Sequence, residues 1–508
     1  MLVSHFTALT RTGRFLRTLS TSYFLLFCTT IYSLGIVPLI LSYQGTSSLG
    51  LWTLIVQFGS YLTLLDAGLS AACIRQFVGP LVRMESQILA AKFQNAFLMA
   101  SLQGVLVVLA GFSGSLLIPL LGIPPEQSRL FSSLFLAQCL LVAWDFPFRP
   151  LNALLLARQR FEFNYLSTGG ATVFSLSVVW WGMKHGWGLW SLIIAGVFQG
   201  IIKSTSTLFS SFRQGGLSDL FSEFHASPRG AFHLLLEGGS FFSGTLFGAL
   251  TGIAQSTFLS RWFGLEGVAL WGIGSKAANL LFQLLSKFYE SSFAGLSELY
   301  ESGRRDLLFQ RLAQLFAAVL GTAGFAGAGV ILLNGLFIQL WTDSRLGWPV
   351  SCDFAVAIWL VAQCASRGLV EQTKILLLWR WIRLSPLTEF LAFLVLGPLL
   401  AGFFALPGFV FGFALSPMVL AGLLFWFGLR PMYSHVRLSI LTPQGYSYIF
   451  SGGLVFLCSG LLIFSPATLS MRVGAAFFVL AIFLWFVLFR VRSCLAHPVL
   501  ATHPHANP

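Results

Sequence analysis

The chain has 508 residues, of which 56% are hydrophobic and only 9% are charged, and its mean hydropathy is +0.81. Soluble domains carry about 25% charged residues, so this composition excludes a soluble globular protein. The net charge of +13 does not indicate a nucleic-acid-binding surface, because the basic residues lie in short gaps between apolar runs. The seven cysteines include no CxxC pair and fall mostly in apolar runs, which excludes a disulfide frame and a metal site of the usual spacing.

Runs of about 20 apolar residues recur along the whole chain, and each can cross the hydrocarbon layer as a helix. After a basic segment at 1–19, the sequence predicts spans at 20–42, 49–72, 95–120, 130–156, 164–183, 189–212, 235–260, 268–292, 313–340, 353–378, 385–406, 408–428, 447–465 and 472–490. The first is too long for a signal peptide and lacks a convincing cleavage site, so we expect a retained anchor. Apolar residues do not alternate with a period of two, so a β-barrel is not expected.

Basic residues predict the orientation of these spans. Of the 30 Lys and Arg residues, 19 lie in segments that are cytoplasmic if the N-terminus is inside, and 5 lie in the segments on the opposite side. The positive-inside rule therefore places both termini in the cytoplasm, because the number of spans is even. Tryptophans gather at the predicted outer ends, as an interfacial belt does: Trp52, Trp187, Trp190, Trp262, Trp271, Trp341 and Trp348.

The longest internal polar gap, 213–234, separates six spans from the next six. The expected fold class is an all-α polytopic membrane protein of about 14 transmembrane helices, two six-helix lobes plus two C-terminal helices. The predicted parts are an N-terminal segment at 1–19, a first lobe at 20–213, a cytoplasmic linker at 214–234, a second lobe at 235–428, two additional helices at 429–490 and a cytoplasmic tail at 491–508.

A short internal repeat supports a duplication of the two lobes. The segment 43–52 (YQGTSSLGLW) superposes on 262–271 (WFGLEGVALW) at an offset of 219, which aligns Gly45 with Gly264. Each segment is the predicted outer turn between the first and second helix of its half. Such repeats would be parallel, related by an axis along the membrane normal. The alternative is a chance match in a chain rich in Gly, Leu and Trp.

Six basic residues lie within the predicted spans: Arg149, Lys203, Lys276, Lys287, Arg367 and Lys374. A cation at the centre of a lone helix costs about 2.5–3.5 kcal/mol on insertion scales, so these side chains should face the interior of the bundle. The carboxylates within spans are Asp66, Asp145 and Glu371, with Glu237, Glu290 and Glu389 nearer the ends.

Two of the six cations have a carboxylate four residues away on the same helix face. Asp145 precedes Arg149 at this spacing, and Glu371 follows Arg367. Each arginine is therefore either locked in an intrahelical ion pair or available for transport.

The four lysines divide into two kinds. Lys287 and Lys374 lie near the inner ends, where we expect them to extend to the cytoplasmic headgroups. Lys203 and Lys276 have no carboxylate three or four positions away, which makes them the stronger candidates for binding an anion. A carboxylate on another helix remains the alternative partner for both.

Glutamines place one amide in each of seven spans: Gln57, Gln103, Gln138, Gln199, Gln255, Gln283 and Gln363. Each is explained equally by an interhelical hydrogen bond. Together with the charges they predict a hydrated cavity that binds hydroxyl-rich material, with these candidate lining residues: Gln57, Gln138, Gln199, Gln283 and Gln363. Asp66 is either a proton or sodium coupling site or a partner of Lys203 or Lys276.

The segment 49–75, LGLWTLIVQFGSYLTLLDAGLSAACIR, resembles the signature of Wzx-type polysaccharide flippases, in which a Gly-Leu-Trp turn leads to a helix that ends in Leu-Asp-x-Gly-Leu. The matching positions are Gly50, Leu51, Trp52, Leu65, Asp66, Gly68 and Leu69. A second landmark follows at 264–297, with LEGVALWGIGSKAANLL after the outer turn. The layout of the first twelve spans is similar to that of the multidrug, oligosaccharidyl-lipid and polysaccharide exporter superfamily.

The resemblance implies two six-helix lobes that rock about a central cavity. The implied cargo is an undecaprenyl-diphosphate-linked oligosaccharide repeat unit, moved from the inner to the outer leaflet by alternating access with coupling to an ion or the membrane potential. A diphosphate needs cations in a cavity shielded from lipid. The candidate substrate-binding residues are Lys203, Lys276, Arg149 and Arg367.

The implied setting is the bacterial cytoplasmic (inner) membrane. The expected partners are the polyprenyl-diphosphate-linked sugar and the lipid bilayer, with other polysaccharide assembly proteins left open. No cofactor and no nucleic acid is expected.

Rival functions remain at this stage. A lipid II flippase or a drug or cation exporter of the same superfamily is close, although cation export would favour acidic sites and here the embedded cations outnumber the carboxylates six to three. A membrane glycosyltransferase or polymerase would need a larger outer loop than this chain has. The histidines show no metal-ligand spacing, and neither a P-loop nor a GxSxG context occurs. The sequence therefore predicts a transporter and not an enzyme.

Overall fold

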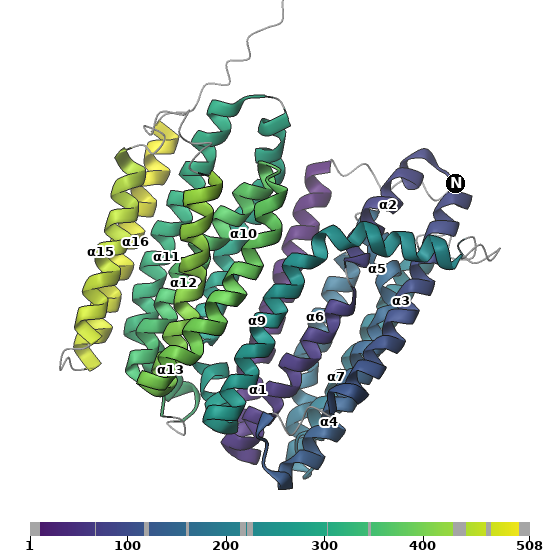
Figure 1. The fold of residues 1–508 in the computed structure, drawn as a ribbon, viewed down its shortest axis with the longest axis horizontal. Helices are drawn as coiled ribbons and strands as arrows, with labels where there is room; N and C mark the ends of the chain where they lie inside the picture. Colours follow the sequence, from purple (N-terminus) through teal and green to yellow (C-terminus); the bar gives the residue numbers. More distant parts are fainter. Residues whose placement is uncertain are drawn as a thin grey trace, which may run out of the picture. The chain divides into compact units, whose positions relative to one another are not determined.

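A computed structural model describes residues 11–66, 68–115, 121–158, 162–213, 220, 227–301, 303–343, 347–429, 443–463 and 469–496. Helices dominate these ranges, and no β-strand occurs within them (Figure 1). The packing divides the chain into two compact units, Met1–Gly272 (unit 1) and Ile273–Pro508 (unit 2). Parts of the predicted N-terminal segment, linker and tail lie outside the described residues, and the predicted lobe boundaries remain predictions.

Unit 1 consists of the helices from α1 to most of α9. They are α1 (Arg11–Leu62), η1 (Thr63–Asp66), α2 (Leu69–Arg83), α3 (Ser86–Ser115), α4 (Pro125–Asp145), η3 (Phe146–Phe148), α5 (Arg149–Ala157), α6 (Glu162–Lys184), α7 (Trp190–Arg213) and most of α9 (Pro228–Gly274). Helix α6 packs against α1 and α7, and α4 contacts α1, α3 and α7. A buried core that includes Phe77 and Phe93, both fully buried, joins α2, α3 and α5.

Unit 2 is built around α11 and α12. Its helices are α10 (Lys276–Glu301), α11 (Arg305–Trp341), α12 (Val350–Ile375), α13 (Trp379–Leu423), the π-helical η4 (Leu424–Leu429), α15 (Pro443–Ile463) and α16 (Leu469–Ala496). Helix α12 packs against α10, α11 and α13, while α11 also carries α15 and α16.

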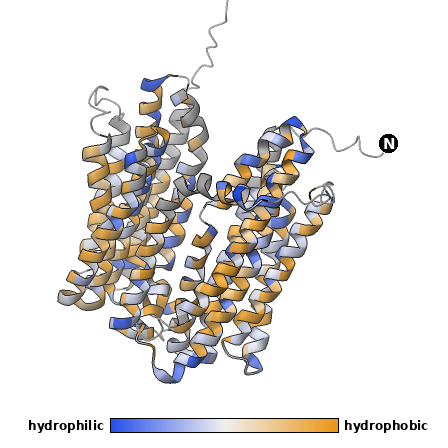
Figure 2. Cartoon of the chain, turned by 45° about the vertical axis from the view of Figure 1, so that its right-hand side comes forward, coloured by the Kyte–Doolittle hydropathy of each residue, from blue (hydrophilic) through white to orange (hydrophobic). Residues whose placement is uncertain are grey.

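The predicted all-α polytopic membrane fold is confirmed. The described part of every predicted span is mainly helical, and the helices are mostly apolar along their lengths (Figure 2). Among the described residues, seven helical stretches are each long and apolar enough to cross a membrane, or eight if the bent pair α9 and α10 counts as one span. Helices α1 and α13 carry two predicted spans each, and the bent pair α9 and α10 carries another two. The other predicted spans beyond these stretches fall on α6 and on the shorter apolar helices of 447–462 and 471–484.

Glycines separate the two spans in α1 and in α9. A straight helix of 52 residues, the length of α1, would be about 78 Å long, whereas the hydrocarbon core is about 30 Å thick. Helix α1 breaks at Gly45 (φ 81°, ψ −179°), and α9 breaks at Gly264 (φ 63°, ψ −171°). Only glycine adopts this region of φ and ψ without strain. The two positions aligned by the internal repeat therefore share one unusual backbone geometry.

Helix α13 folds back on itself at Ala405 (φ 52°, ψ −136°). A Cβ atom on Gly412 would lie 2.6 Å from the Cα of Gly397, and the rings of Phe393 and Phe409 are 5.6 Å apart. Residues before Ala405 thus lie beside residues that follow it at a similar distance along the chain, which indicates two antiparallel arms. The predicted pair of spans around Pro407 is therefore a tight helical hairpin.

The two C-terminal helices both pack on α11, and the backbones of α15 and α11 come especially close. A Cβ atom on Gly324 would lie 2.8 Å from the backbone carbonyl of Gly452, and one on Gly452 would lie 2.6 Å from the carbonyl oxygen of Gly321. The hydroxyl groups of Thr322 and Tyr448 are 2.9 Å apart, within hydrogen-bond distance. Small residues let helix backbones approach closely, so this contact fixes α15 on α11.

Candidate functional site

Asp66 lies at an interruption of the second predicted span. The chain leaves α1 through the 3-10 turn η1 and enters α2 after Gly68, whose φ is 80°. The Asp66 carboxylate accepts hydrogen bonds from the backbone N–H of Ser70 (3.2 Å) and from its hydroxyl (2.8 Å). Gln103 on α3 donates to the Asp66 backbone carbonyl at 3.1 Å. Asp66 therefore satisfies donors at the start of α2, as a helix cap does.

Arg149 lies at a second interruption, between α4 and α5. Pro147 lacks a backbone N–H and prevents a regular helix from running through this point. Arg149 contacts Asp66 (Nη1 to Oδ1, 3.0 Å) and Asp145 (Nε to Oδ2, 3.4 Å), and its guanidinium carbon lies 3.7 Å from the centroid of the Phe146 ring. One arginine thus joins two carboxylates that come from different helices.

Lys203 completes this arrangement from α7. Its ammonium nitrogen lies 2.5 Å from Oδ1 of Asp145. We call the four residues Asp66, Arg149, Asp145 and Lys203 the charge network. It holds two cations and two carboxylates, so its net charge is zero. The exposed fraction of the side chain is 16% for Asp66 and 15% for Arg149, and it rises to 30% for Asp145 and 40% for Lys203. Lys203 is therefore the most accessible member.

The charge network both confirms and corrects the sequence interpretation. The predicted pair of Asp145 and Arg149, four residues apart, is present, although the 3-10 turn η3 separates the two residues. Lys203 does have a carboxylate partner, on α4, which resolves the alternative left open by the sequence. Asp66 pairs with Arg149, while the carboxylate that Lys203 contacts is that of Asp145. The coupling role of Asp66 stays a prediction.

A polar seam that the sequence did not suggest lies close to the charge network in sequence, on α5, α6 and α7. Asn164 donates to Thr207 (3.0 Å) and accepts from Ser210 (2.8 Å), and Thr207 donates to Asn152 (2.9 Å). Thr207 lies one turn after Lys203 on α7. Because these side chains satisfy one another, polar contacts continue from the lysine along α7.

In unit 2, Glu371 on α12 is shared by two cations. It lies 3.1 Å from Nη2 of Arg367 and 2.8 Å from Nζ of Lys374. The pairing of Arg367 with Glu371 is as predicted. Lys374 also pairs with Glu371, which lies three residues earlier on the same helix, and its extension to the cytoplasmic headgroups stays a prediction. Arg367 and Lys374 are 37% and 35% exposed, whereas the Glu371 side chain is 9% exposed.

Lys276 is the first residue of α10, after a single residue that interrupts the helix. Its side chain is half-buried. Within the part of the chain that the structure describes, the Lys276 ammonium has neither an ion pair nor a hydrogen bond. It differs in this from Arg149, Lys203 and Arg367, the other predicted cargo ligands.

The five candidate glutamines have different surroundings. Ser256 donates to Oε1 of Gln57 (2.5 Å), Gln199 donates to Ser175 (2.6 Å) and Gln363 donates to Glu389 (2.7 Å). These three therefore serve as hydrogen-bond partners between elements, the simpler of the two interpretations.

The two other candidate glutamines have different neighbours. The side chain of Gln138 packs against Gly59, where a Cβ atom would lie 2.8 Å from its Cγ, and Gln283 is exposed. A role of the five in lining a cavity stays a prediction.

Asp353 forms a buried polar centre at the start of α12 that the sequence analysis did not identify. Its side chain is 1% exposed, and Oδ1 accepts hydrogen bonds from Asn334 (2.6 Å) and from the indole N–H of Trp348 (2.7 Å). Asn334 also donates to the backbone carbonyl of Gly274 at 3.0 Å. Asp353 thus connects α11, α12 and the end of α9.

We expect an Asp353→Leu variant to lose about 1–3 kcal/mol of unfolding free energy, because the partly buried Trp348 N–H loses its acceptor. Asn334 keeps its bond to Gly274, which limits the loss. Thermal unfolding in lipid nanodiscs measures the effect. An Asp353→Asn variant retains an acceptor oxygen and should unfold close to the wild type; equal destabilisation by both variants would contradict this account.

Comparison with known proteins gives a clear answer for the fold alone. No family model matches the sequence, and no curated protein matches it. The lipid II flippase MurJ in an inward closed conformation superposes with a TM-score of 0.66 at 13% identity, over 95% of this chain and 99% of its own. An inward-facing multidrug resistance MATE family transporter of the MOP superfamily gives 0.62 at 14% identity, over 81% and 96%. A MATE structure in the bent conformation gives 0.55 at 14% identity, over 85% and 97%.

The chain is therefore a polytopic all-α membrane protein with the fold that these transporters share. The likeness to the lipid II flippase covers more of this chain than does the likeness to either MATE structure. The 5% that it leaves uncovered is shorter than the 28 residues of α16, so the flippase fold extends at least in part over the two C-terminal helices.

Proposed function

We propose that the chain is a flippase that moves polyprenyl-diphosphate-linked oligosaccharide repeat units from the inner to the outer leaflet of the bacterial cytoplasmic membrane. Transport proceeds by alternating access, with coupling to an ion or to the membrane potential. Both termini lie in the cytoplasm, as the distribution of basic residues favours. The protein acts as a transporter and not as an enzyme.

The observation that carries this proposal is the charge network with Lys203 at its accessible end. A cation within the membrane costs about 2.5–3.5 kcal/mol on insertion scales, and a carboxylate partner offsets that cost when no cargo is bound. Asp145 serves both Lys203 and Arg149. Lys203 can therefore turn to a diphosphate while Asp145 keeps Arg149 as its partner. An anionic headgroup thus finds a cation without leaving a carboxylate unpaired.

The second unit offers the same chemistry in another form. Arg367 and Lys374 share the single carboxylate of Glu371, so this group carries a net charge of +1. Lys276 adds a further cation that has no partner among the described residues. Ammonium and guanidinium donors suit phosphate oxygens. Anionic cargo is favoured over cationic cargo for this reason.

The extent of the structural likeness supports a flippase over a drug exporter. MurJ is a lipid II flippase, and its fold covers 95% of this chain, against 81% and 85% for the two MATE structures. Drug or cation export remains the second candidate, because MATE transporters share the fold. The Wzx-type cargo is favoured over lipid II by the Leu-Asp-x-Gly-Leu segment that ends at Leu69.

Deletion of the gene tests the proposal. We expect a single polyprenyl-linked repeat unit to accumulate and to stay inaccessible to a lectin added outside spheroplasts, because the unit is built on the inner leaflet. Extraction of the lipid-linked saccharides and lectin labelling measure both effects. An unchanged saccharide pool together with higher sensitivity to cationic drugs would instead assign the protein to export. Accumulation of lipid II would assign it to the peptidoglycan pathway.

A further inference from the structure

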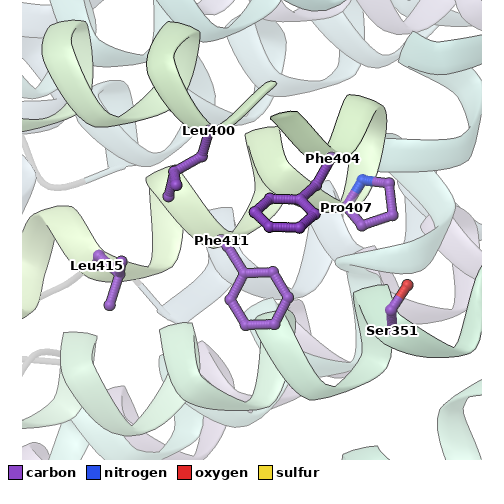
Figure 3. A pocket seen from close by; sticks show the side chains of 6 residues that line it. All are labelled: Ser351, Leu400, Phe404, Pro407, Phe411 and Leu415. Atoms are coloured by element: carbon purple, nitrogen blue, oxygen red, sulfur yellow. The ribbon is translucent and has the colours of Figure 1, made fainter. Parts of the chain in front are cut away.

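A cavity of about 520 Å³ lies beside the turn of the α13 hairpin, within unit 2. It is lined by Ser351 at the start of α12 and by residues from both arms of α13: Leu400, Phe404, Pro407, Phe411 and Leu415. Figure 3 shows Ser351 and Pro407 at one side of this space, Leu400 and Leu415 at the other, and the rings of Phe404 and Phe411 between them. We call it the hairpin cavity.

The hairpin cavity opens on an exposed apolar surface of unit 2. On the first arm of α13, Val395, Leu399 and Phe403 are 64%, 54% and 74% exposed, and Phe404, which lines the cavity, is 65% exposed. Large apolar side chains exposed on the helices of a polytopic membrane protein contact the bilayer. The cavity is therefore continuous with the lipid-facing surface of α13.

Water does not fill a cavity of this lining. Five of the six lining side chains are apolar, and the Ser351 hydroxyl is the one polar group among them. Apolar cavities stay dry because water finds too few polar partners in them. Left empty, the lining would forgo its dispersion contacts on one side. A chain from the adjoining bilayer restores these contacts at no cost in hydrogen bonds.

The size of the cavity limits what it can hold. The volume of about 520 Å³ suits part of a single hydrocarbon chain and not a whole lipid. The nine residues from Pro407 to Leu415 span about 12 Å of helix, close to the roughly 15 Å of one leaflet's hydrocarbon.

We propose that the hairpin cavity binds one acyl chain of a phospholipid in the leaflet where the α13 turn lies, which is the outer leaflet in the predicted topology. The ester end of the lipid lies near Ser351, and the chain runs along the two arms towards Leu415. The bound chain fills the space beside Ala405, whose positive φ is strained for a residue with a Cβ atom. This site is separate from the cargo and does not depend on what the cargo is.

Photo-crosslinking in nanodiscs tests this site. The full chain is reconstituted with phosphatidylglycerol that carries a diazirine in the middle of one acyl chain, irradiated, and mapped by mass spectrometry of its peptides. We expect the label to concentrate on the segment around Phe404, Phe411 and Leu415. A Leu415→Trp variant, which fills the deep end, should lower this label at least fivefold. Val395→Trp on the exposed side of the same helix should leave it unchanged.

Two further measurements decide the outcome. Ser351→Phe fills the other end from a different helix and should also lower the label at least fivefold, which covers the case that Leu415→Trp does not fold. An equal amount of unlabelled polyprenyl diphosphate should not displace the label. Even labelling along α13, labelling that both filling variants leave unchanged, or displacement by the polyprenyl lipid would each overturn the proposal.

Discussion

An Arg149→Gln variant is expected to lose about 3–5 kcal/mol of unfolding free energy, as is usual when one partner is removed from a buried ion pair. Arg149 is 15% exposed and contacts both Asp66 and Asp145. Without it, Asp66 has no cation in contact among the described residues, and Asp145 keeps only Lys203. Thermal unfolding of the purified chain in nanodiscs, with folded yield from the membrane as a second measure, reports the loss.

A compensating variant separates lost charge balance from lost packing. Arg149→Gln combined with Asp66→Asn removes one cation and one anion, and leaves the pair of Asp145 and Lys203 intact. The asparagine oxygen still accepts from Ser70. Most of the lost stability should return in this double variant. If the double variant unfolds as early as Arg149→Gln alone, the effect comes from packing around Phe146 and the electrostatic account is wrong.

Transport should fall by about 10- to 150-fold in a Lys203→Gln variant that folds normally. A hydrogen bond to a charged group contributes about 1.5–3 kcal/mol, and each 1.4 kcal/mol is a factor of ten. Stability should change little, because Lys203 is 40% exposed and Asp145 retains Arg149. The rate at which a lipid-linked oligosaccharide becomes accessible to lectin in proteoliposomes measures transport. Lys203→Arg keeps the cation and should keep most of the activity.

One double variant decides what the lysine does. If Lys203 serves only to neutralise Asp145, adding Asp145→Asn to Lys203→Gln restores transport. If it contacts the anionic cargo, the double variant stays inactive although the network is again balanced. We expect the second result. Restored transport would remove Lys203 from the cargo site.

Lys276→Gln extends the experiment to unit 2. No carboxylate pairs with Lys276 in the described part of the chain, so its substitution removes a cation without creating an unpaired anion. We expect a loss of transport with unchanged thermal stability. If this variant transports at the wild-type rate, Arg367 becomes the main candidate for cargo binding in the second unit.

The breaks between spans could be predicted from local sequence because local chemistry causes them. Gly45 and Gly264 were aligned by the repeat, and each adopts a backbone conformation that favours glycine. The hairpin at Pro407 was placed correctly for a related reason, although its residue of positive φ is Ala405. Intrahelical pairs such as Arg367 with Glu371 on α12 also follow from the 3.6-residue period.

Contacts between helices could not be predicted in the same way. Lys203 and Asp145 are 58 positions apart in the sequence, and their contact depends on how α4 and α7 pack. The pairing of Asp66 with Arg149 depends on two helix interruptions whose relative position no local pattern encodes. Asp353 lies in the first turn of α12, where the local sequence does not indicate burial, yet packing of α11 and Trp348 buries it. Burial is a tertiary property, and hydropathy in one segment does not report it.

The contact of α15 with α11 has a consequence for relatives of this chain. Gly321, Gly324 and Gly452 meet backbone to backbone, so a larger residue at any of them would displace the last two helices. A relative that ends after the second lobe has no helix equivalent to α15, and lipid would cover the surface of α11 at the two glycine positions. The two positions on α11 should therefore vary with chain length, being small in long relatives and bulky in short ones. An alignment sorted by length would turn this packing detail into a marker of whether the final hairpin was gained or lost.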